Sequence, residues 1–103
     1  MLGGVAMIET MTFRLLDGVD HAAFLEADAR LQSDFAYRQR GIMRRTTAQG
    51  SGDRADEWLV VDIWRTGDDA DRAAEKWDAH PEAQAFLAFV DRSTIEVRRY
   101  AAL

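Results

Sequence analysis

The sequence contains no cysteine, which excludes disulfide frameworks, thiolate metal sites and cysteine nucleophiles. Long apolar runs are also absent, because the longest uncharged stretches, Met1–Ile8 and Ala83–Val90, fall well short of the ~20 residues that span a bilayer. The amino-terminal stretch lacks a basic segment followed by a long apolar one, so we expect no secretory signal. These absences predict a soluble, cytoplasmic protein without a membrane partner.

An excess of positive charge is missing as well. The formal net charge is −5, whereas a nucleic-acid surface needs clustered cations that displace counterions from phosphates, so we expect no nucleic-acid partner. With 103 residues, of which 48% are hydrophobic, the chain has the size of one domain spanning residues 1–103. A domain this small leaves much apolar surface exposed when it stays alone, which favours self-association.

Four segments have the composition of strands: Val5–Leu15, Ile42–Ala48, Trp58–Trp64 and Thr94–Tyr100. The third is the most apolar. Alternation along it places Trp58, Val60, Asp62 and Trp64 on one face and Leu59, Val61 and Ile63 on the other. The glycine-rich turn Gln49–Asp53 joins the second and third strands and is typical of a hairpin.

A helix is predicted after the first strand. Asp20 is a good N-cap, since its carboxylate can accept hydrogen bonds from the open amides of a first helical turn. Apolar residues then recur at helical spacing from Phe24 to Phe35. Gly41 is placed to end this helix in the left-handed conformation.

A second helical segment follows the third strand. Thr66–Asp69 has the composition of an N-terminal cap, and Ala70–Trp77 continues with helical spacing. Pro81, the single proline, interrupts this helix because it lacks an amide hydrogen, and it can open a further helix at its first position. We expect Phe86–Val90 to lie inside that further helix.

The resulting order, β-α-β-β-α-β, is that of the ferredoxin-like α+β sandwich, a four-stranded antiparallel sheet with helices on one face. The handedness of crossovers makes the first and third strands the central pair. Both strands are apolar on two sides, yet helices cover only one side of such a sheet. The simplest cover for the other side is the same face of a second copy, so we predict a homodimer with sheets packed face to face.

Three stretches carry a resemblance to known proteins: Leu16–Gly18 after the first strand, Arg40–Ile42 before the second, and VVDIWRTGDDA with EKWDAHPEAQAF in the second half. The chain resembles the dimeric α/β-barrel superfamily, and within it the antibiotic-biosynthesis-monooxygenase-like domains. The resemblance covers nearly the whole chain and implies a dimeric α/β barrel. Relatives of this type include cofactor-free quinone-forming oxygenases, heme-degrading enzymes, small isomerases and domains without an assigned activity.

Asparagine is also absent from the chain. The resemblance implies an asparagine amide near the reacting oxygen in the quinone-forming and heme-degrading relatives, so neither set of catalytic groups is complete here. The polar residues that could replace the amide are Glu9, Thr10, Asp62 and Arg44.

Two residues are the candidates for catalysis. His80 lies where the resemblance implies a histidine before a short helix, and it can carry a proton or polarise a substrate oxygen. The alternative is a helix-end histidine that is satisfied by a backbone carbonyl. Asp62 is a carboxylate on an otherwise apolar strand, so it must be paired or have an altered protonation state. Its candidate partners are Arg44, Arg45, Arg98 and Arg99.

The expected substrate pocket is flat and apolar. Trp64 and Trp77 are predicted to form its walls, with Glu9, Tyr37 and Phe24 as further lining residues. The alternative is that the aromatic residues belong to the core and to subunit contacts. We expect no metal, because two histidines without a short spacing do not supply three or four converging ligands, and we expect no cofactor.

Two functions remain open. The first is a cofactor-free monooxygenase- or isomerase-like enzyme acting on a hydrophobic or aromatic small molecule, with water exclusion and polar groups stabilising an enolate-like anion. The alternative is a non-catalytic module of the same fold that binds a small ligand or serves assembly. The missing asparagine favours the alternative slightly, whereas an enclosed cavity reached by His80 or Asp62 would favour the enzyme.

Overall fold

The computed structural model describes residues 5–103. Within these residues, the strands and α-helices are β1 (Met7–Leu15), α1 (His21–Asp34), β2 (Ile42–Gln49), β3 (Trp58–Trp64), α2 (Gly67–Trp77), α3 (Pro81–Leu87) and β4 (Val90–Ala101). Two short 3-10 turns, η1 (Ala36–Arg38) and η2 (Gly52–Arg54), flank β2. Every helix between residues 5 and 103 is too short or too polar to span a bilayer.

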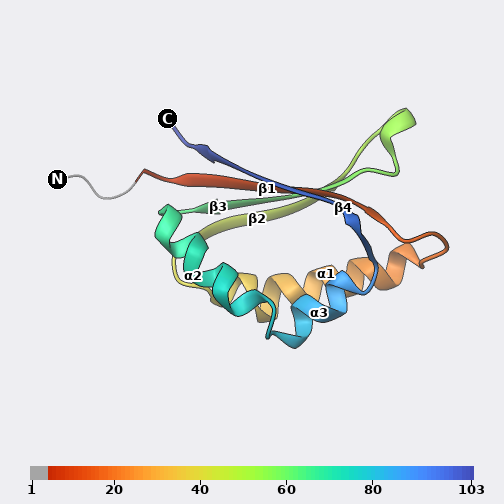
Figure 1. Cartoon of the computed structure of the whole chain (residues 1–103), viewed down its shortest axis with the longest axis horizontal. Coiled ribbons are helices and arrows are strands. Elements are labelled where there is room, and N and C mark those ends of the chain that lie inside the picture. Colours follow the sequence, from red (N-terminus) through yellow and green to blue (C-terminus); the bar gives the residue numbers. More distant parts are fainter. Residues whose placement is uncertain (1–4) are drawn as a thin grey trace.

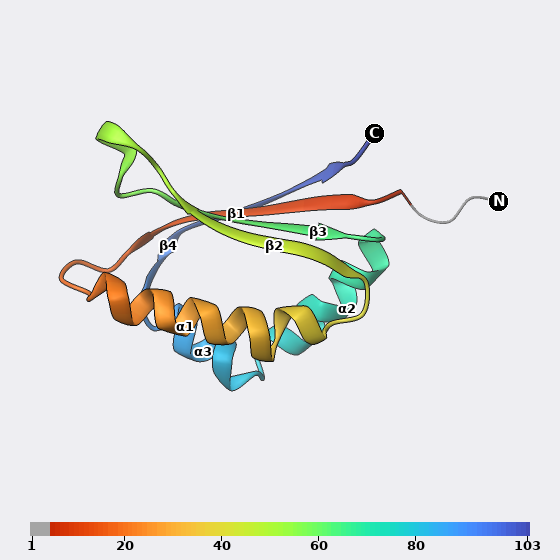
Figure 2. The same ribbon diagram turned by 180° about the vertical axis from the view of Figure 1, so that it is seen from behind.

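The strands form an antiparallel sheet in the order β2-β3-β1-β4, so β1 and β3 are the central pair, as predicted. The helices lie together on one side of the sheet, and no helix of the described chain covers the other side (Figure 1 and Figure 2). This element order with a one-sided helix layer confirms the ferredoxin-like α+β fold.

The register of the sheet brings four charged residues into one line. Residues directly opposite each other in an antiparallel pair point to the same side. Arg45 of β2 lies opposite Asp62 of β3, Asp62 lies opposite Glu9 of β1, and Glu9 lies opposite Arg99 of β4. We call these four residues the charged row. Trp64, two positions along β3 from Asp62, is buried against the helices, so the charged row also faces the helix layer.

The opposite side of the sheet is apolar at its centre. Four partly exposed aliphatic residues of the two central strands lie there: Ile8, Leu59, Val61 and Ile63. Their neighbours on the edge strands β2 and β4 include Thr46, Glu96 and Arg98. We call this the open face.

Between sheet and helices, the buried apolar residues form two clusters. The larger is built around the fully buried side chains Phe13, Phe24, Leu31, Phe86 and Val90. Its rings meet edge to face, as Phe24 does with Trp58 at a centroid distance of 5.0 Å. The smaller cluster consists of Met7, Trp64, Ala70 and Ala73.

The helix caps agree with the sequence, but the end of α1 does not. The Asp20 carboxylate accepts from the Ala22 amide at 2.9 Å, as expected for an N-cap. The prediction that Gly41 ends this helix is wrong: α1 ends at Asp34, and Phe35 has already left helical geometry. Gly41 has a φ of +85° directly before β2, where an added Cβ would lie 2.1 Å from Asp69 Oδ2. It is needed at a turn against α2.

The start of β4 also differs from the prediction. Pro81 opens α3 as expected, but the helix ends at Leu87, and Val90 lies in the sheet rather than in the helix. Val90 pairs with Leu15, and the Leu16 amide donates to the Phe89 carbonyl at 2.9 Å. Strand pairing with the end of β1 therefore overrides the helical spacing of these apolar residues.

Candidate functional site

A partly open cavity of about 310 Å³ lies between the charged row and helix α2. Helix α2 leaves room for it because it faces the sheet with the small side chains of Ala70, Ala73 and Ala74. All four members of the charged row contribute to the lining. The remaining wall is apolar and includes Phe35, Val60, Trp64 and Trp77. The charged row therefore crosses a cavity whose other walls are apolar.

Asp62 is the polar centre of this cavity. Its Oδ1 atom is buried and has no hydrogen-bond partner among residues 5–103. The nearest cation is the Arg45 guanidinium, whose Nε lies 3.8 Å from Oδ1, too far for a hydrogen bond. Burial, the largest effect, raises the pKa of Asp62 from 3.8 to about 6; Arg45 opposes this, while Glu9 and Asp28 reinforce it. The carboxyl therefore exchanges its proton close to neutral pH.

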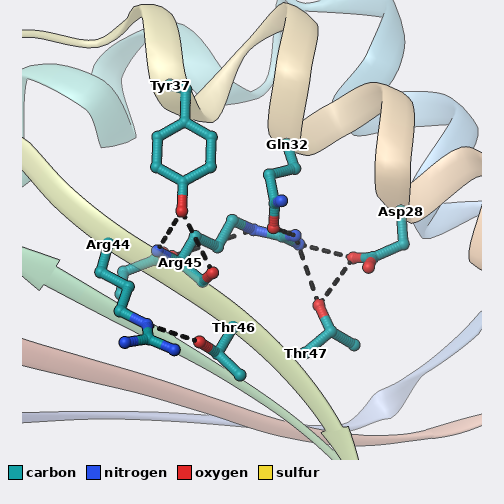
Figure 3. A network of polar contacts seen from close by, with 8 residues as sticks. Asp28, Gln32, Tyr37, Arg44, Arg45, Thr46 and Thr47 are labelled. Atoms are coloured by element: carbon teal, nitrogen blue, oxygen red, sulfur yellow. Dashed lines mark hydrogen bonds and ion pairs between the residues drawn. The ribbon is translucent and has the colours of Figure 1, made fainter.

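Arg45 belongs to a polar network that links β2 to α1 (Figure 3). Its Nη2 donates to Asp28 Oδ1 at 2.7 Å, and its Nη1 donates to Gln32 and Thr47 at 3.3 Å each. The Tyr37 hydroxyl accepts from the Arg45 amide at 2.9 Å and donates to the Arg45 carbonyl at 3.3 Å. The network fixes both the backbone and the guanidinium of Arg45.

The other end of the charged row is tied to α2. Arg99 Nε donates to Glu9 Oε2 at 2.9 Å, and Arg99 Nη1 donates to Asp71 Oδ1 at 2.6 Å. The two carboxylates hold the Arg99 guanidinium and raise its pKa, chiefly through the hydrogen bond to Asp71. This bridge joins β1 and β4 to the helix beside the cavity.

Two tryptophans, Trp64 and Trp77, line the cavity. Trp64 is 4% exposed, and its indole Nε1 has no hydrogen-bond partner among the described residues. Trp77 meets Phe35 edge to face at a centroid distance of 5.7 Å. Trp64 and Asp62 are two positions apart on β3, so the two side chains point to the same face of the sheet, and each has a buried polar atom without a partner among residues 5–103.

Three predicted site residues lie outside the cavity lining. His80 is the N-cap of α3: its Nδ1 accepts from the Glu82 amide at 3.4 Å, and its ring packs on Phe35. Tyr37 supports the backbone of Arg45. Phe24 is fully buried in the larger cluster. Of the seven predicted site residues, the cavity brings together Glu9, Asp62, Trp64 and Trp77.

The sequence interpretation missed Arg99 and the alanines of α2 as cavity residues. Three alanines in one short helix indicate either that the helix packs closely against the sheet or that a cavity lies between helix and sheet. The sequence alone does not distinguish these two arrangements. Within residues 5–103, no three histidine or acidic side chains converge as a metal site requires. The candidate site therefore consists of the charged row and aromatic walls.

Several solved structures share the fold that holds this site. No family model matches the chain, and no curated protein matches its sequence. Among solved structures, SnoaB, a cofactor-independent oxygenase from Streptomyces nogalater, is similar with a TM-score of 0.77 and 24% identity, covering 97% of this chain and 95% of its own. A proposed antibiotic biosynthesis monooxygenase from Bordetella bronchiseptica has a TM-score of 0.79 and 16% identity, with 96% and 98% covered. One from Nitrosomonas europaea has a TM-score of 0.72 and 18% identity, with 100% and 95% covered.

The chain has the fold of the antibiotic-biosynthesis-monooxygenase-like proteins. A SnoaB variant in which an asparagine is replaced by alanine is similar too, with a TM-score of 0.76. The present chain contains no asparagine at all. In this version of the fold, the polar side chains that line the cavity belong to the charged row.

Proposed function

We propose that the protein is a cofactor-free, monooxygenase-like enzyme that acts on a hydrophobic aromatic small molecule bound in the cavity. One observation carries the proposal: Asp62 and Trp64 lie two positions apart on the same face of β3 and both line an apolar cavity, and the buried atoms Asp62 Oδ1 and Trp64 Nε1 have no hydrogen-bond partner among residues 5–103. Buried polar atoms are nearly always hydrogen-bonded, so an unpaired donor and acceptor beside a cavity favour a ligand that supplies both partners.

The cavity favours a flat ligand that carries a hydroxyl group and a carbonyl oxygen along one edge. Its volume of about 310 Å³ is at the lower end of small-molecule sites, which span roughly 300–1,000 Å³. The indole N–H of Trp64 can only donate, so it needs an oxygen acceptor on the ligand. The ionised Asp62 carboxylate can only accept, so it needs a hydroxyl donor.

The same pair of atoms supports a proton transfer. Asp62, with a pKa of about 6, is largely ionised at pH 7 and is well matched to take a proton from a ligand hydroxyl. The Trp64 N–H stabilises the negative charge left on the conjugated ligand oxygen. An electron-rich anion of this kind can reduce O2 itself: one oxygen atom enters the ring as a quinone carbonyl, and the other leaves as water.

The similarity to SnoaB supports the oxygenase class, since that protein is a cofactor-independent oxygenase of the same fold. His80, the other catalytic candidate from the sequence, lies outside the cavity, and we assign it no step. In our proposal Asp62 is the base, Trp64 is the hydrogen-bond donor, and Trp77 and Phe35 hold the ring system.

The test uses a hydroxylated anthrone as the probe. We expect its binding to quench tryptophan fluorescence and its oxidation to consume O2 faster than in a protein-free control. Asp62→Asn is expected to abolish the accelerated O2 uptake. Trp64→Phe removes one neutral hydrogen bond, worth about 1 kcal/mol, and is expected to weaken binding by about fivefold. Trp58→Phe is the matched control, because Trp58 is equally buried but lies outside this cavity. Unchanged O2 uptake in Asp62→Asn would refute the proposal.

A non-catalytic ligand-binding module is the second candidate. It is favoured by the absence of asparagine and by the position of His80, which leave Asp62 without a second proton-transfer group that is not already held in an ion pair. Quenching by the anthrone that depends on Asp62 and Trp64, without any added O2 uptake, would identify this function.

We also propose that the protein forms a homodimer through the open face. Aliphatic residues at the centre of a sheet, ringed by polar ones, are typical of a covered surface, and a second copy offers the same shape and chemistry. Val61→Glu places a charge at the centre of the open face. We expect light scattering to give the mass of two chains for the wild type at micromolar concentration and of one chain for this variant. A single-chain mass for the wild type would contradict the dimer.

A further inference from the structure

The closest cation to Asp62 in the sheet is turned away from it. Arg45 lies directly opposite Asp62, where an arginine and an aspartate ordinarily attract each other across the strands. Its Nη2 instead lies 2.7 Å from Asp28 Oδ1, while its Nε stays 3.8 Å from Asp62 Oδ1. The hydrogen bonds of the guanidinium therefore go to α1 and to β2 itself, although the acceptor on the neighbouring strand is unused.

Several contacts hold the guanidinium in this direction (Figure 3). Gln32 and Thr47 both accept from Arg45 Nη1, and the Thr47 hydroxyl also donates to Asp28 Oδ1 at 3.0 Å. The hydroxyl of Tyr37 fixes the backbone of the same arginine. Asp28 is 8% exposed and Arg45 is 6% exposed, so water weakens their attraction little.

The other charged groups around Asp62 are engaged as well. Glu9, opposite Asp62 on β1, is held by Arg99 of β4, and Arg99 also binds Asp71 of α2. At the cavity itself, α2 presents alanines and Trp77, none of which titrates. The charged neighbours on β1, β2, β4 and α1 thus have partners of their own, and Asp62 is the member of the charged row left without a hydrogen bond.

We propose that Asp28 is a positioning residue: it holds the Arg45 guanidinium at α1 and so keeps the Asp62 carboxyl available to exchange a proton with a ligand in the cavity. The catalytic meaning of this arrangement rests on the proposed function, but the arrangement belongs to the protein without ligand. The raised pKa of Asp62 agrees with it, because a direct hydrogen bond from arginine lowers the pKa of an aspartate below its ordinary value.

The test is a titration of the Asp62 side-chain 13C carboxyl signal by NMR, assigned by its loss in Asp62→Asn. The wild-type midpoint is expected near pH 6. Asp28→Asn removes one negative charge and loosens the hold on Arg45, and both effects lower the midpoint, by about one pH unit or more. Glu26→Gln, which removes an exposed carboxylate from the same helix, is the matched control and is expected to leave the midpoint unchanged. An unchanged or higher midpoint in Asp28→Asn would overturn the proposal.

A second variant covers the case in which Asp28→Asn does not fold. Asp28→Asn with Arg45→Met removes both members of the buried Asp28–Arg45 pair together, so neither of them is left as an unpaired ion. If Asp28 holds Arg45 as proposed, the two deletions oppose each other and the midpoint stays close to the wild-type value. If Arg45 acts chiefly on Asp62, the midpoint rises by about one pH unit or more, and the proposal is refuted.

The titration uses no ligand, so it separates this inference from the proposed function. A lower midpoint in Asp28→Asn, together with no binding of the anthrone, would leave the positioning intact and refute the enzyme. An unshifted midpoint in Asp28→Asn, together with O2 uptake that depends on Asp62, would refute the positioning role of Asp28 and support the enzyme. If the positioning and the enzyme activity are both correct, Asp28→Asn is expected to lower two values together: the pH at which O2 uptake is half-maximal and the midpoint of the Asp62 carboxyl titration.

Discussion

The buried carboxyl of Asp62 is predicted to cost the protein stability at neutral pH. Its pKa is about 6 in the folded protein and 3.8 ordinarily. A difference of about two, at roughly 1.4 kcal/mol for each pH unit, amounts to about 3 kcal/mol by which ionisation of this group favours the unfolded chain. Asp62→Asn keeps the shape and removes the charge. We therefore expect it to stabilise the protein by about 3 kcal/mol at pH 7.5.

The sign of the pH dependence follows from the two pKa values. Between pH 3.8 and 6 the folded protein holds the Asp62 proton that the unfolded chain has released, so stability falls as the pH rises through this range. Above that range the cost is constant. The advantage of Asp62→Asn is therefore expected to shrink to about 1 kcal/mol at pH 4.5.

Urea unfolding at fixed protein concentration, at pH 4.5 and at pH 7.5, measures both values. Asp17→Asn serves as the control, because Asp17 is exposed and its replacement removes the same charge. Equal stability of the wild type and Asp62→Asn at pH 7.5, or a gap that does not change with pH, would refute the account of the buried carboxyl.

Three further predictions test the fold and the site. Gly41→Ala is expected to lower the free energy of unfolding by more than about 2 kcal/mol, because φ at Gly41 is positive and the new Cβ meets Asp69. Gly18→Ala also has a positive φ but adds its Cβ in open space, so we expect a loss of only about 1 kcal/mol. Similar losses for the two variants in thermal unfolding would contradict this. Phe24→Ala empties the larger cluster and is expected to cost about 3–5 kcal/mol in urea, and a loss below 1 kcal/mol would be inconsistent with its burial. His80→Ala removes an N-cap worth about 1 kcal/mol and leaves anthrone affinity unchanged; weaker binding without loss of stability would return His80 to the site.

The fold could be predicted because each element carries a local signal. Asp20 and Pro81 mark helix starts through chemistry that the backbone needs at those positions. The alternation along Trp58–Trp64 matches the observed burial, with the tryptophans turned inward. Gly41 was assigned to the wrong role because a positive φ is required there for a turn, and glycine alone does not say whether that turn ends a helix.

The sequence could not single out Arg45 from the other candidate arginines as the cross-strand neighbour of Asp62, because that choice depends on the register between β2 and β3. The sequence suggested a turn at Gln49–Asp53, but Gln49 already lies opposite Trp58, and the hairpin is centred nearer to Arg54. A tighter turn would have placed a different residue beside Asp62. Even with the correct register, the direction of the Arg45 guanidinium is set by Asp28, which lies on another element.

The split of the apolar interior into two unequal clusters has a consequence for motion. Helix α2 contributes only Ala70 and Ala73 to the smaller cluster, and each buries little more than one methyl group. We expect the amides of α2 to exchange with deuterium earlier than those of α1, since this end can open while the phenylalanine-rich end stays closed. A ligand that contacts both Trp64 and Trp77 would stabilise α2 against this local opening. The rates at which a ligand enters and leaves the cavity would therefore depend on how often α2 opens.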